Sequence, residues 1–243
     1  MRNFEKIFSK LTYSHDVSRV WEDFLDYSID QFLLNGLSEK HFQYKKYSKK
    51  EQKYFGELFE CWIKTTHEKL ETVSWYDFLG TFYEEIVLGK FKAGNLGQFF
   101  TPAHICTLMS DLLPKENTGV CNDPCCGSGR LLLAHHVNNL EDICFGEDLD
   151  NVACRMAVLN FVIHGVKGSI CHKNTITGEW FKSWKVNEFL YHGLPIPHVE
   201  VVSYEHSQTF FGMNLDKKIE DNNVEINESV VFTEKETVQT TLI

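Results

Sequence analysis

The chain has 243 residues, which corresponds to one or two domains of about 150 residues and is long enough to bury a sizeable core. A hydrophobic content of 43% with 24% charged residues is typical of globular proteins and excludes a fibrous or wholly disordered chain. The net charge of −10 argues against a protein covered in basic charge, although a local basic face remains compatible with nucleic-acid binding.

Residues 1–94 are predicted to be a helical region, because their apolar residues recur with a helical period. Ser48 and Glu51 form a capping box, in which each side chain satisfies a free amide at the helix start. Two apolar stripes follow at spacings of three and four, Phe55, Leu58, Phe59, Trp62 and Ile63 and then Trp75, Phe78, Leu79, Phe82 and Ile86. At least two helices therefore share an aromatic-rich seam.

Residues 95–215 are predicted to be an α/β domain, because short apolar strands alternate with helices as in βαβ units. The expected strands are 119–123, 143–148 and 169–172, and the expected helices after the first two of them are 130–139 and 151–164. We therefore expect a Rossmann-like, mostly parallel sheet with an N-terminal helical region. Residues 216–243 are acidic and polar and are expected to form a loosely ordered or docked tail.

A further helix is predicted to precede the first strand. Thr101 would cap it and Pro102 would occupy its first position, where the missing N–H has no cost. Its expected buried face consists of Ile105, Leu108, Met109 and Leu112.

A glycine-rich turn, Asp123-Pro124-Cys125-Cys126-Gly127-Ser128-Gly129, joins the first strand to the next helix. Glycines allow positive φ, and a helix N-terminus presents free amides with a positive dipole end. Such a turn binds a polar or anionic group of a nucleotide-like ligand. Asp148 ends the following strand, where a carboxylate accepts hydrogen bonds from ribose hydroxyls. The alternatives are a turn that binds nothing and an Asp148 that serves only as a helix-start charge.

Other nucleotide and catalytic motifs are disfavoured. The dinucleotide fingerprint needs a third glycine where this chain has Leu132, and no phosphate-binding G-x-x-x-x-G-K-[ST] occurs. Cys126 and Arg130 replace the glycines that would make Ser128 a nucleophile elbow. The cysteines and histidines have no partners at metal-ligand spacing, so we expect no metal site. By elimination, S-adenosylmethionine fits the turn best.

Three stretches of the sequence match the motifs of one family. Gly97-Gln98-Phe99-Phe100-Thr101-Pro102 matches G-Q-[FY]-[FY]-T-P, the glycine turn matches D-P-x-C-G-[ST]-G, and Gly146-Glu147-Asp148-Leu149-Asp150 corresponds to G-x-E-x-D with aspartate in place of glutamate. On these motifs, the chain resembles the N-6 adenine-specific DNA methyltransferases related to the modification subunit of type I restriction systems. Asn174 falls where the family usually has aspartate.

The resemblance implies a set of residues that bind S-adenosylmethionine. Its members are Phe99, Phe100, Thr101, Pro102, Asp123, Cys125, Gly127, Ser128, Gly129, Asp148 and Asn174. The Phe99–Pro102 stretch would surround the methionine part, Asp148 would bind the ribose, and Asn174 would approach the adenine. Plain core packing is an equally valid interpretation of the two phenylalanines.

The family's catalytic loop, [DN]-P-P-[YFW], is absent, since none of the five prolines is next to another. Leu194-Pro195-Ile196-Pro197-His198 lies at about the right place without that chemistry. Such a loop accepts hydrogen bonds from the target amine and stacks on the flipped base. Two hypotheses remain: an adenine methyltransferase of a restriction–modification system that acts with an unusual loop or a partner, and a degenerate relative that binds or interacts without turnover. A methyltransferase for a small molecule or protein is a third, less favoured by the G-Q-F-F-T-P stretch.

The expected partner is DNA, contacted through a separate specificity subunit or another chain. A basic run between Lys45 and Lys53, interleaved with Tyr44, Tyr47 and Tyr54, has two interpretations, a phosphate-contacting surface and a solvated helix start. No run of about 18 apolar residues and no signal peptide is present, so we expect a cytoplasmic protein with reduced cysteines and no membrane span.

Overall fold

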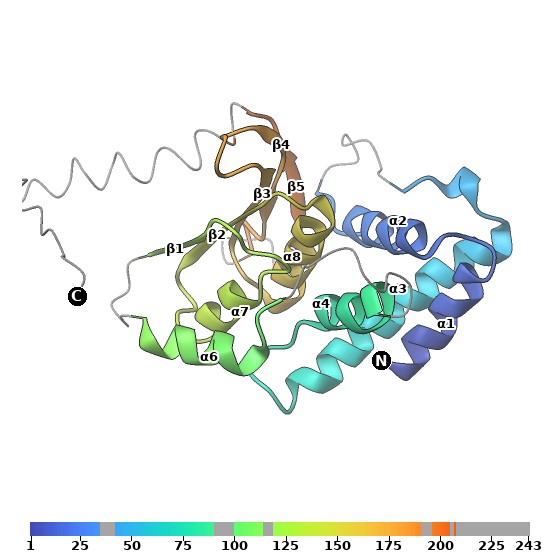
Figure 1. Ribbon diagram of the computed structural model, residues 1–243, viewed down its shortest axis with the longest axis horizontal. Coiled ribbons are helices and arrows are strands. Elements are labelled where there is room, and N and C mark those ends of the chain that lie inside the picture. The colour runs from blue at the N-terminus through green and yellow to red at the C-terminus, as the bar shows by residue number, and fades with distance from the viewer. Residues whose placement is uncertain (35–41, 90–99, 114–118, 191–195, 205–206, 208–243) are drawn as a thin grey trace, which may run out of the picture. The chain divides into compact units, whose positions relative to one another are not determined.

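Three α-helices open the chain in the computed structural model, which describes residues 1–34, 42–89, 100–113, 119–190, 196–204 and 207 (Figure 1). They are α1 (Arg2–Thr12), α2 (Val17–Asp30) and α3 (Lys49–Leu70), and a 3-10 turn, η1 (Tyr44–Lys46), precedes α3. The side chain of Asp16 caps α2, and the predicted capping box of Ser48 and Glu51 is present at the start of α3. Local sequence therefore sets both helix starts.

An aromatic cluster holds these helices to the next segment, α4 (Phe78–Phe82), which continues into a π-helical turn, η2 (Tyr83–Leu88). Phe4 of α1 meets Phe82 edge-on at 4.7 Å between ring centroids, and Trp21 of α2 stacks on the same ring at 5.3 Å. Such pairs contribute about 0.5–1.5 kcal/mol each beyond the area they bury. The two predicted stripes lie in the same core: Phe55, Leu58 and Trp62 of α3 and Phe78, Leu79 and Phe82 of α4 are all buried there. The predicted aromatic seam is confirmed, and α1 and α2 extend it.

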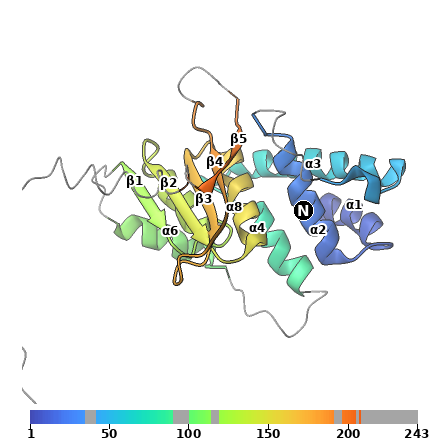
Figure 2. The ribbon, with the colours of Figure 1, turned by 90° about the horizontal axis from the view of Figure 1, so that it is seen from above.

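The α/β part contains the sheet that carries the site. Its strands are β1 (Val120–Asp123), β2 (Ile143–Asp148), β3 (Gly168–Lys173), β4 (Trp180–Val186) and β5 (Val199–Val202), and its helices are α6 (Ala103–Leu112), α7 (Arg130–His136) and α8 (Asn151–His164). The strands lie in the order in which they occur in the sequence, with β1 at one edge (Figure 2). The α/β fold expected from the sequence is confirmed.

The sheet is mixed. β1 pairs with β2 and β2 with β3 in parallel, whereas β3–β4 and β4–β5 are antiparallel. The expected parallel arrangement thus holds for the three strands that are joined through α7 and α8. It fails beyond β3 because only residues 174–179 connect β3 to β4, and a connection that short permits a hairpin but no crossover helix.

Helix α8 is the central element of the packing. It lies between the sheet and the N-terminal helices (Figure 2), and most of its side chains are buried. Arg155 on α8 reaches α2, where it pairs with Asp26 at 2.8 Å and with Glu22 at 3.2 Å. Residues Met1–Ser207 form one compact unit, so the helical region and the sheet share a core.

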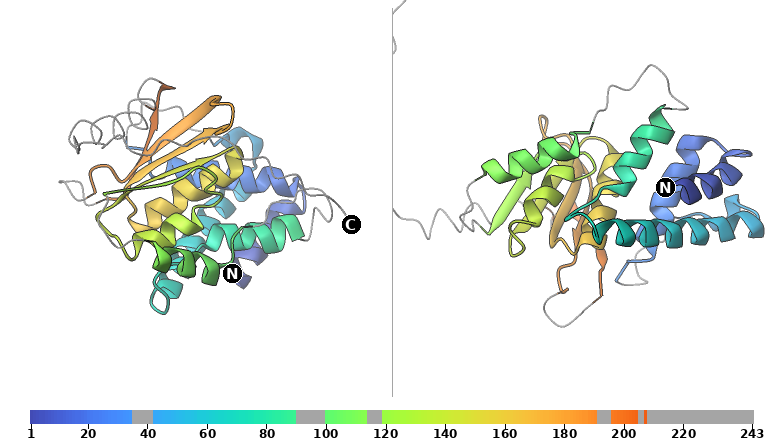
Figure 3. Two further views of the ribbon diagram at one scale, coloured as in Figure 1. Left: turned by 60° about the vertical axis from the view of Figure 1, so that its left-hand side comes forward. Right: turned by 90° about the horizontal axis from the view of Figure 1, so that it is seen from below.

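The predicted orientation of α6 is wrong. Ile105, Leu108, Met109 and Leu112 are exposed, and the side of the helix that is buried consists of Cys106 and Ser110. The reason is that α6 packs against α7 (Figure 3), and these two small side chains permit the close approach. There the Ser110 hydroxyl donates to the Ala134 carbonyl oxygen at 3.0 Å. The cap is also displaced by one residue, since Pro102 occupies the cap position and the helix begins at Ala103.

None of the helices in the described part of the chain combines the length and hydropathy that a membrane-spanning helix needs.

Candidate functional site

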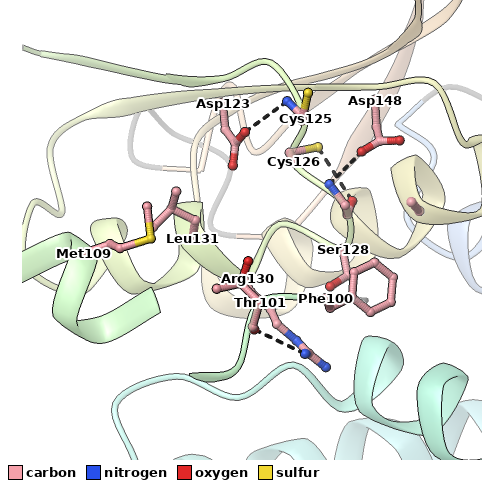
Figure 4. Close-up of a pocket in the computed structure, with 12 residues that line it drawn as sticks. Phe100, Thr101, Met109, Asp123, Cys125, Cys126, Ser128, Arg130, Leu131 and Asp148 are labelled. Atoms are coloured by element: carbon pink, nitrogen blue, oxygen red, sulfur yellow. Dashed lines mark hydrogen bonds between the residues drawn. The ribbon is translucent and has the colours of Figure 1, made fainter. Parts of the chain in front are cut away.

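A cavity of about 380 Å³ opens at the carboxyl ends of β1 and β2 (Figure 4). The glycine turn forms its floor. Gly127 and Gly129 have φ values of +55° and +86°, which residues with a Cβ rarely adopt. A Cβ at Gly127 would also lie 2.9 Å from the Phe100 ring, so glycine is required here for space as well as for conformation.

Two carboxylates face this cavity from adjacent strands, Asp123 at the end of β1 and Asp148 at the end of β2. Asp148 accepts hydrogen bonds from the backbone N–H of Gly127 and of Asp150, both at 2.8 Å, and therefore also holds the turn in shape. Asp123 accepts from the Cys125 N–H at 3.0 Å. Burial raises the pKa of Asp123, the nearby Asp148 adds to the rise, and the Cys125 hydrogen bond opposes it.

The segment before α6 closes another side of the cavity. Phe100 and Thr101 line it, as do Met109 of α6, Cys125 and Ser128. Pro102 follows directly as the cap residue of α6, but it does not line the cavity among the described residues. Phe99 lies outside the described residues.

A buried network behind the turn was missed in the sequence. Asp77, only 2% exposed, accepts four hydrogen bonds: from the Gly80 N–H, the Asn160 amide, the Ser128 hydroxyl and Nε of Arg130, at 2.6–2.8 Å. Burial lowers the pKa of Arg130, but the carboxylates of Asp77 and Glu84 outweigh it, so this pKa lies above its ordinary value. The Ser128 hydroxyl is thus a hydrogen-bond donor to the buried carboxylate of Asp77. The local sequence indicates only that Asp77, directly before Phe78, can cap a helix start, and it does not indicate the contacts with Ser128, Arg130 and Asn160.

Besides Pro102, two more of the predicted site residues lie apart from the cavity lining, Gly129 and Asn174. Gly129 is the cap residue of α7, and a Cβ added there would meet Ala157 and Phe161 of α8. Asn174 lies in the β3–β4 connection, where its side-chain oxygen accepts from the N–H groups of Ile176 and Thr177. Asn174 therefore shapes a turn in this structure.

Cys125 is the exposed thiol of the site, and most other described cysteines are buried. Burial raises the pKa of Cys121 to about 11 and raises the pKa of Cys126 and Cys154 well above the ordinary value. No group of three or more potential metal-ligand side chains occurs in the part of the chain that the structure describes.

The basic run at the start of α3 includes tyrosines that pack against the core, Tyr47 and Tyr54. Tyr47 is buried and its hydroxyl donates to Asp23 at 2.7 Å, so it is not a stacking surface for nucleic acid. Lys46 lies 3.9 Å from the same carboxylate. Lys45 of η1 and Lys49, Lys50 and Lys53 of α3 are exposed, which both interpretations of the basic run predict.

A comparison with protein-family models identifies the family of this chain. The model of the N-6 DNA methylase family matches residues 74–239, which is well over half of the chain. The chain belongs to the N-6 DNA methylase family. The resemblance identified from the sequence motifs is thereby confirmed, and the match includes Asp77, the glycine turn and Asp148.

Several curated restriction-enzyme proteins are similar to this chain. The type I restriction enzyme MjaVIII methylase subunit of Methanocaldococcus jannaschii is 31% identical over 96 residues, which is 37% of this chain and 16% of that protein. The type II restriction enzyme and methyltransferase RM.BcgI of Heyndrickxia coagulans is 29% identical over 140 residues, 51% of this chain and 22% of that protein. The chain thus spans about a fifth of the length of these relatives.

A solved structure, the methyltransferase subunit of a type I restriction-modification system from Streptococcus thermophilus, is 21% identical to this chain. The similarity covers 67% of this chain and 36% of that one, with a TM-score of 0.32. A similarity at this level supports no conclusion about the site.

Proposed function

We propose that this chain binds S-adenosylmethionine in the cavity at the carboxyl ends of β1 and β2. The observation that carries the proposal is the pair of carboxylates, Asp123 and Asp148, that faces one cavity behind a glycine turn. Two carboxylates repel the phosphates of a dinucleotide or of ATP. They favour a ligand with a sulfonium, an ammonium and a ribose diol, and S-adenosylmethionine carries all three.

The residues present fit distinct parts of this cofactor. Asp148 accepts hydrogen bonds from the ribose hydroxyls with the lone pairs that its two backbone bonds leave free. Asp123 and the Gly127–Gly129 turn hold the methionine end, together with Phe100, Thr101 and the adjoining Phe99 and Pro102. Asn174 approaches the adenine only if the β3–β4 turn opens, because its oxygen is engaged in that turn.

Replacing Asp148 by alanine tests the proposal. We expect affinity for S-adenosylmethionine to fall by about 10- to 150-fold, because a charge-assisted hydrogen bond contributes about 1.5–3 kcal/mol. Isothermal titration calorimetry measures both proteins, and near-UV circular dichroism checks that the loss of the Gly127 contact has not unfolded the variant. Equal affinities would remove Asp148 from the ribose site, and a wild-type chain that does not bind the cofactor would overturn the proposal.

We further propose that the chain contributes this cofactor site to adenine methylation of DNA in a restriction–modification system of the cytoplasm. The printed names of the relatives, methylase subunits and a restriction enzyme and methyltransferase, support this assignment. No adjacent prolines occur in the sequence, so the acceptor loop for the flipped base has no equivalent here. A partner chain that carries an acceptor loop and recognises DNA would complete the reaction, and without it the chain is a non-catalytic binding subunit.

The purified chain alone is therefore expected to transfer methyl groups to duplex DNA only at the background rate. The amine lone pair of adenine stays delocalised without its acceptors, and a net charge of −10 disfavours docking on a polyanion. The assay follows tritium from labelled cofactor into mixed-sequence DNA, with and without cell extract, and extract alone is the control. Robust incorporation by the chain alone would mean that another acceptor, such as Asn174, replaces the loop.

A further inference from the structure

Glu84, in the π-helical turn η2, bonds to the segment that closes the cavity. One oxygen of its carboxylate, Oε1, accepts the backbone N–H of Phe100 at 2.9 Å. The other, Oε2, accepts from Nη2 of Arg130 at 2.8 Å. Glu84 thereby joins the helical region to both the Phe100–Thr101 segment and the first residue of α7. Short π-helical stretches inside helices frequently occur at functional sites.

Arg130 completes the connection from the side of the glycine turn. Its Nη1 donates to the Thr101 carbonyl oxygen at 3.4 Å, and its guanidinium carbon lies 5.2 Å from the centre of the Phe100 ring (Figure 4). Its Nε is held by Asp77 at 2.7 Å, so the guanidinium has little freedom to move. The Phe100–Thr101 backbone is thus held at one N–H by Glu84 and at one carbonyl by Arg130.

We propose that Glu84 is a positioning residue, which acts through Phe100 and Arg130 to place the Phe100–Thr101 segment against the amino-acid end of the cofactor. This inference rests on the proposed binding of S-adenosylmethionine. Glu84 itself does not line the cavity, so its influence passes through the two groups that it binds. The ribose end of the site, at Asp148, has no bond to Glu84 among the described contacts.

A comparison of two ligands tests this role. Glu84→Ala removes both acceptors, and we expect it to weaken S-adenosylmethionine binding about tenfold or more. Binding of 5′-methylthioadenosine, which has the nucleoside but lacks the amino-acid end, is expected to change less than about threefold. Glu84→Gln keeps the size of the side chain but offers one acceptor to two donors, so its effect on S-adenosylmethionine is expected to be smaller.

Glu22→Ala is the matched control. Glu22 also belongs to the helical region and also pairs with an arginine of the α/β part, Arg155, but that pair lies on α2 and α8 and does not contact Phe100. We expect this variant to bind both ligands as the wild type does.

Hydrogen exchange gives a second measurement that needs no ligand. The Phe100 amide is expected to exchange at least about tenfold faster in Glu84→Ala, and at the wild-type rate in Glu22→Ala, in site-resolved NMR spectra. Equal weakening of both ligands, unchanged binding of S-adenosylmethionine, or an unchanged Phe100 exchange rate would each overturn the positioning role. A wild-type chain that fails to bind S-adenosylmethionine would instead overturn the proposed function.

Discussion

Replacing Arg130 by methionine is expected to lower the free energy of unfolding by about 3–5 kcal/mol, because it leaves a buried carboxylate without its cation. Asp77 is only 2% exposed, and Arg130 supplies its single cationic partner among the described contacts, at 2.7 Å. The other donors to Asp77, from Gly80, Ser128 and Asn160, are neutral. Urea denaturation followed by tryptophan fluorescence measures the change.

Two further variants serve as a control and as a test of partial rescue. Lys64→Met removes an exposed ion pair with Glu68 one helical turn away and is expected to change stability by about 0.5 kcal/mol or less. The double variant Asp77→Asn/Arg130→Met should recover part of the loss, because no buried charge then remains unpaired. A loss of less than about 1 kcal/mol for Arg130→Met would contradict the assignment of Asp77 and Arg130 as the buried centre of the network.

Gly168→Ala is expected to be the other large effect, with a loss of about 4 kcal/mol or more, or no folded protein. Gly168 begins β3, pairs with Cys144 of β2 and is buried. An added Cβ would overlap the backbone carbonyl of Cys144, and a backbone group cannot move aside as a flexible side chain does. The two strands would have to separate where their parallel pairing begins. Thermal and urea unfolding measure the loss.

Gly56→Ala is the same chemical change with the opposite expectation. Gly56 lies inside α3, and an added Cβ would meet only the Tyr27 hydroxyl oxygen, at an ordinary 3.5 Å. Alanine is a better helix former, so stability should rise by about 0.5–1 kcal/mol. If Gly168→Ala lowered the free energy of unfolding no more than Gly56→Ala does, the close approach of β2 and β3 at Gly168 would be contradicted.

The sequence by itself determined the features that depend on near neighbours. The caps at Ser48 and Asp150 were predictable, because a capping side chain bonds to amides two or three residues away. The strand, glycine turn and helix around Gly127 were predictable for the same reason, since positive φ and the sharp turn are local requirements. The position of Asp148 beside the glycine turn was also predictable, because one helix and one strand separate it from the turn.

Only the tertiary structure decided which way side chains point and which distant residues meet. The apolar stripe of α6 faces outward, because the small residues Cys106 and Ser110 let the helix approach α7 on the other side. Asp77 meets Ser128 and Arg130 across about 50 residues of sequence, so no local pattern indicates that a serine of the glycine turn bonds to a buried carboxylate. Helical periodicity states which residues share a face, but what covers that face depends on contacts made elsewhere in the chain.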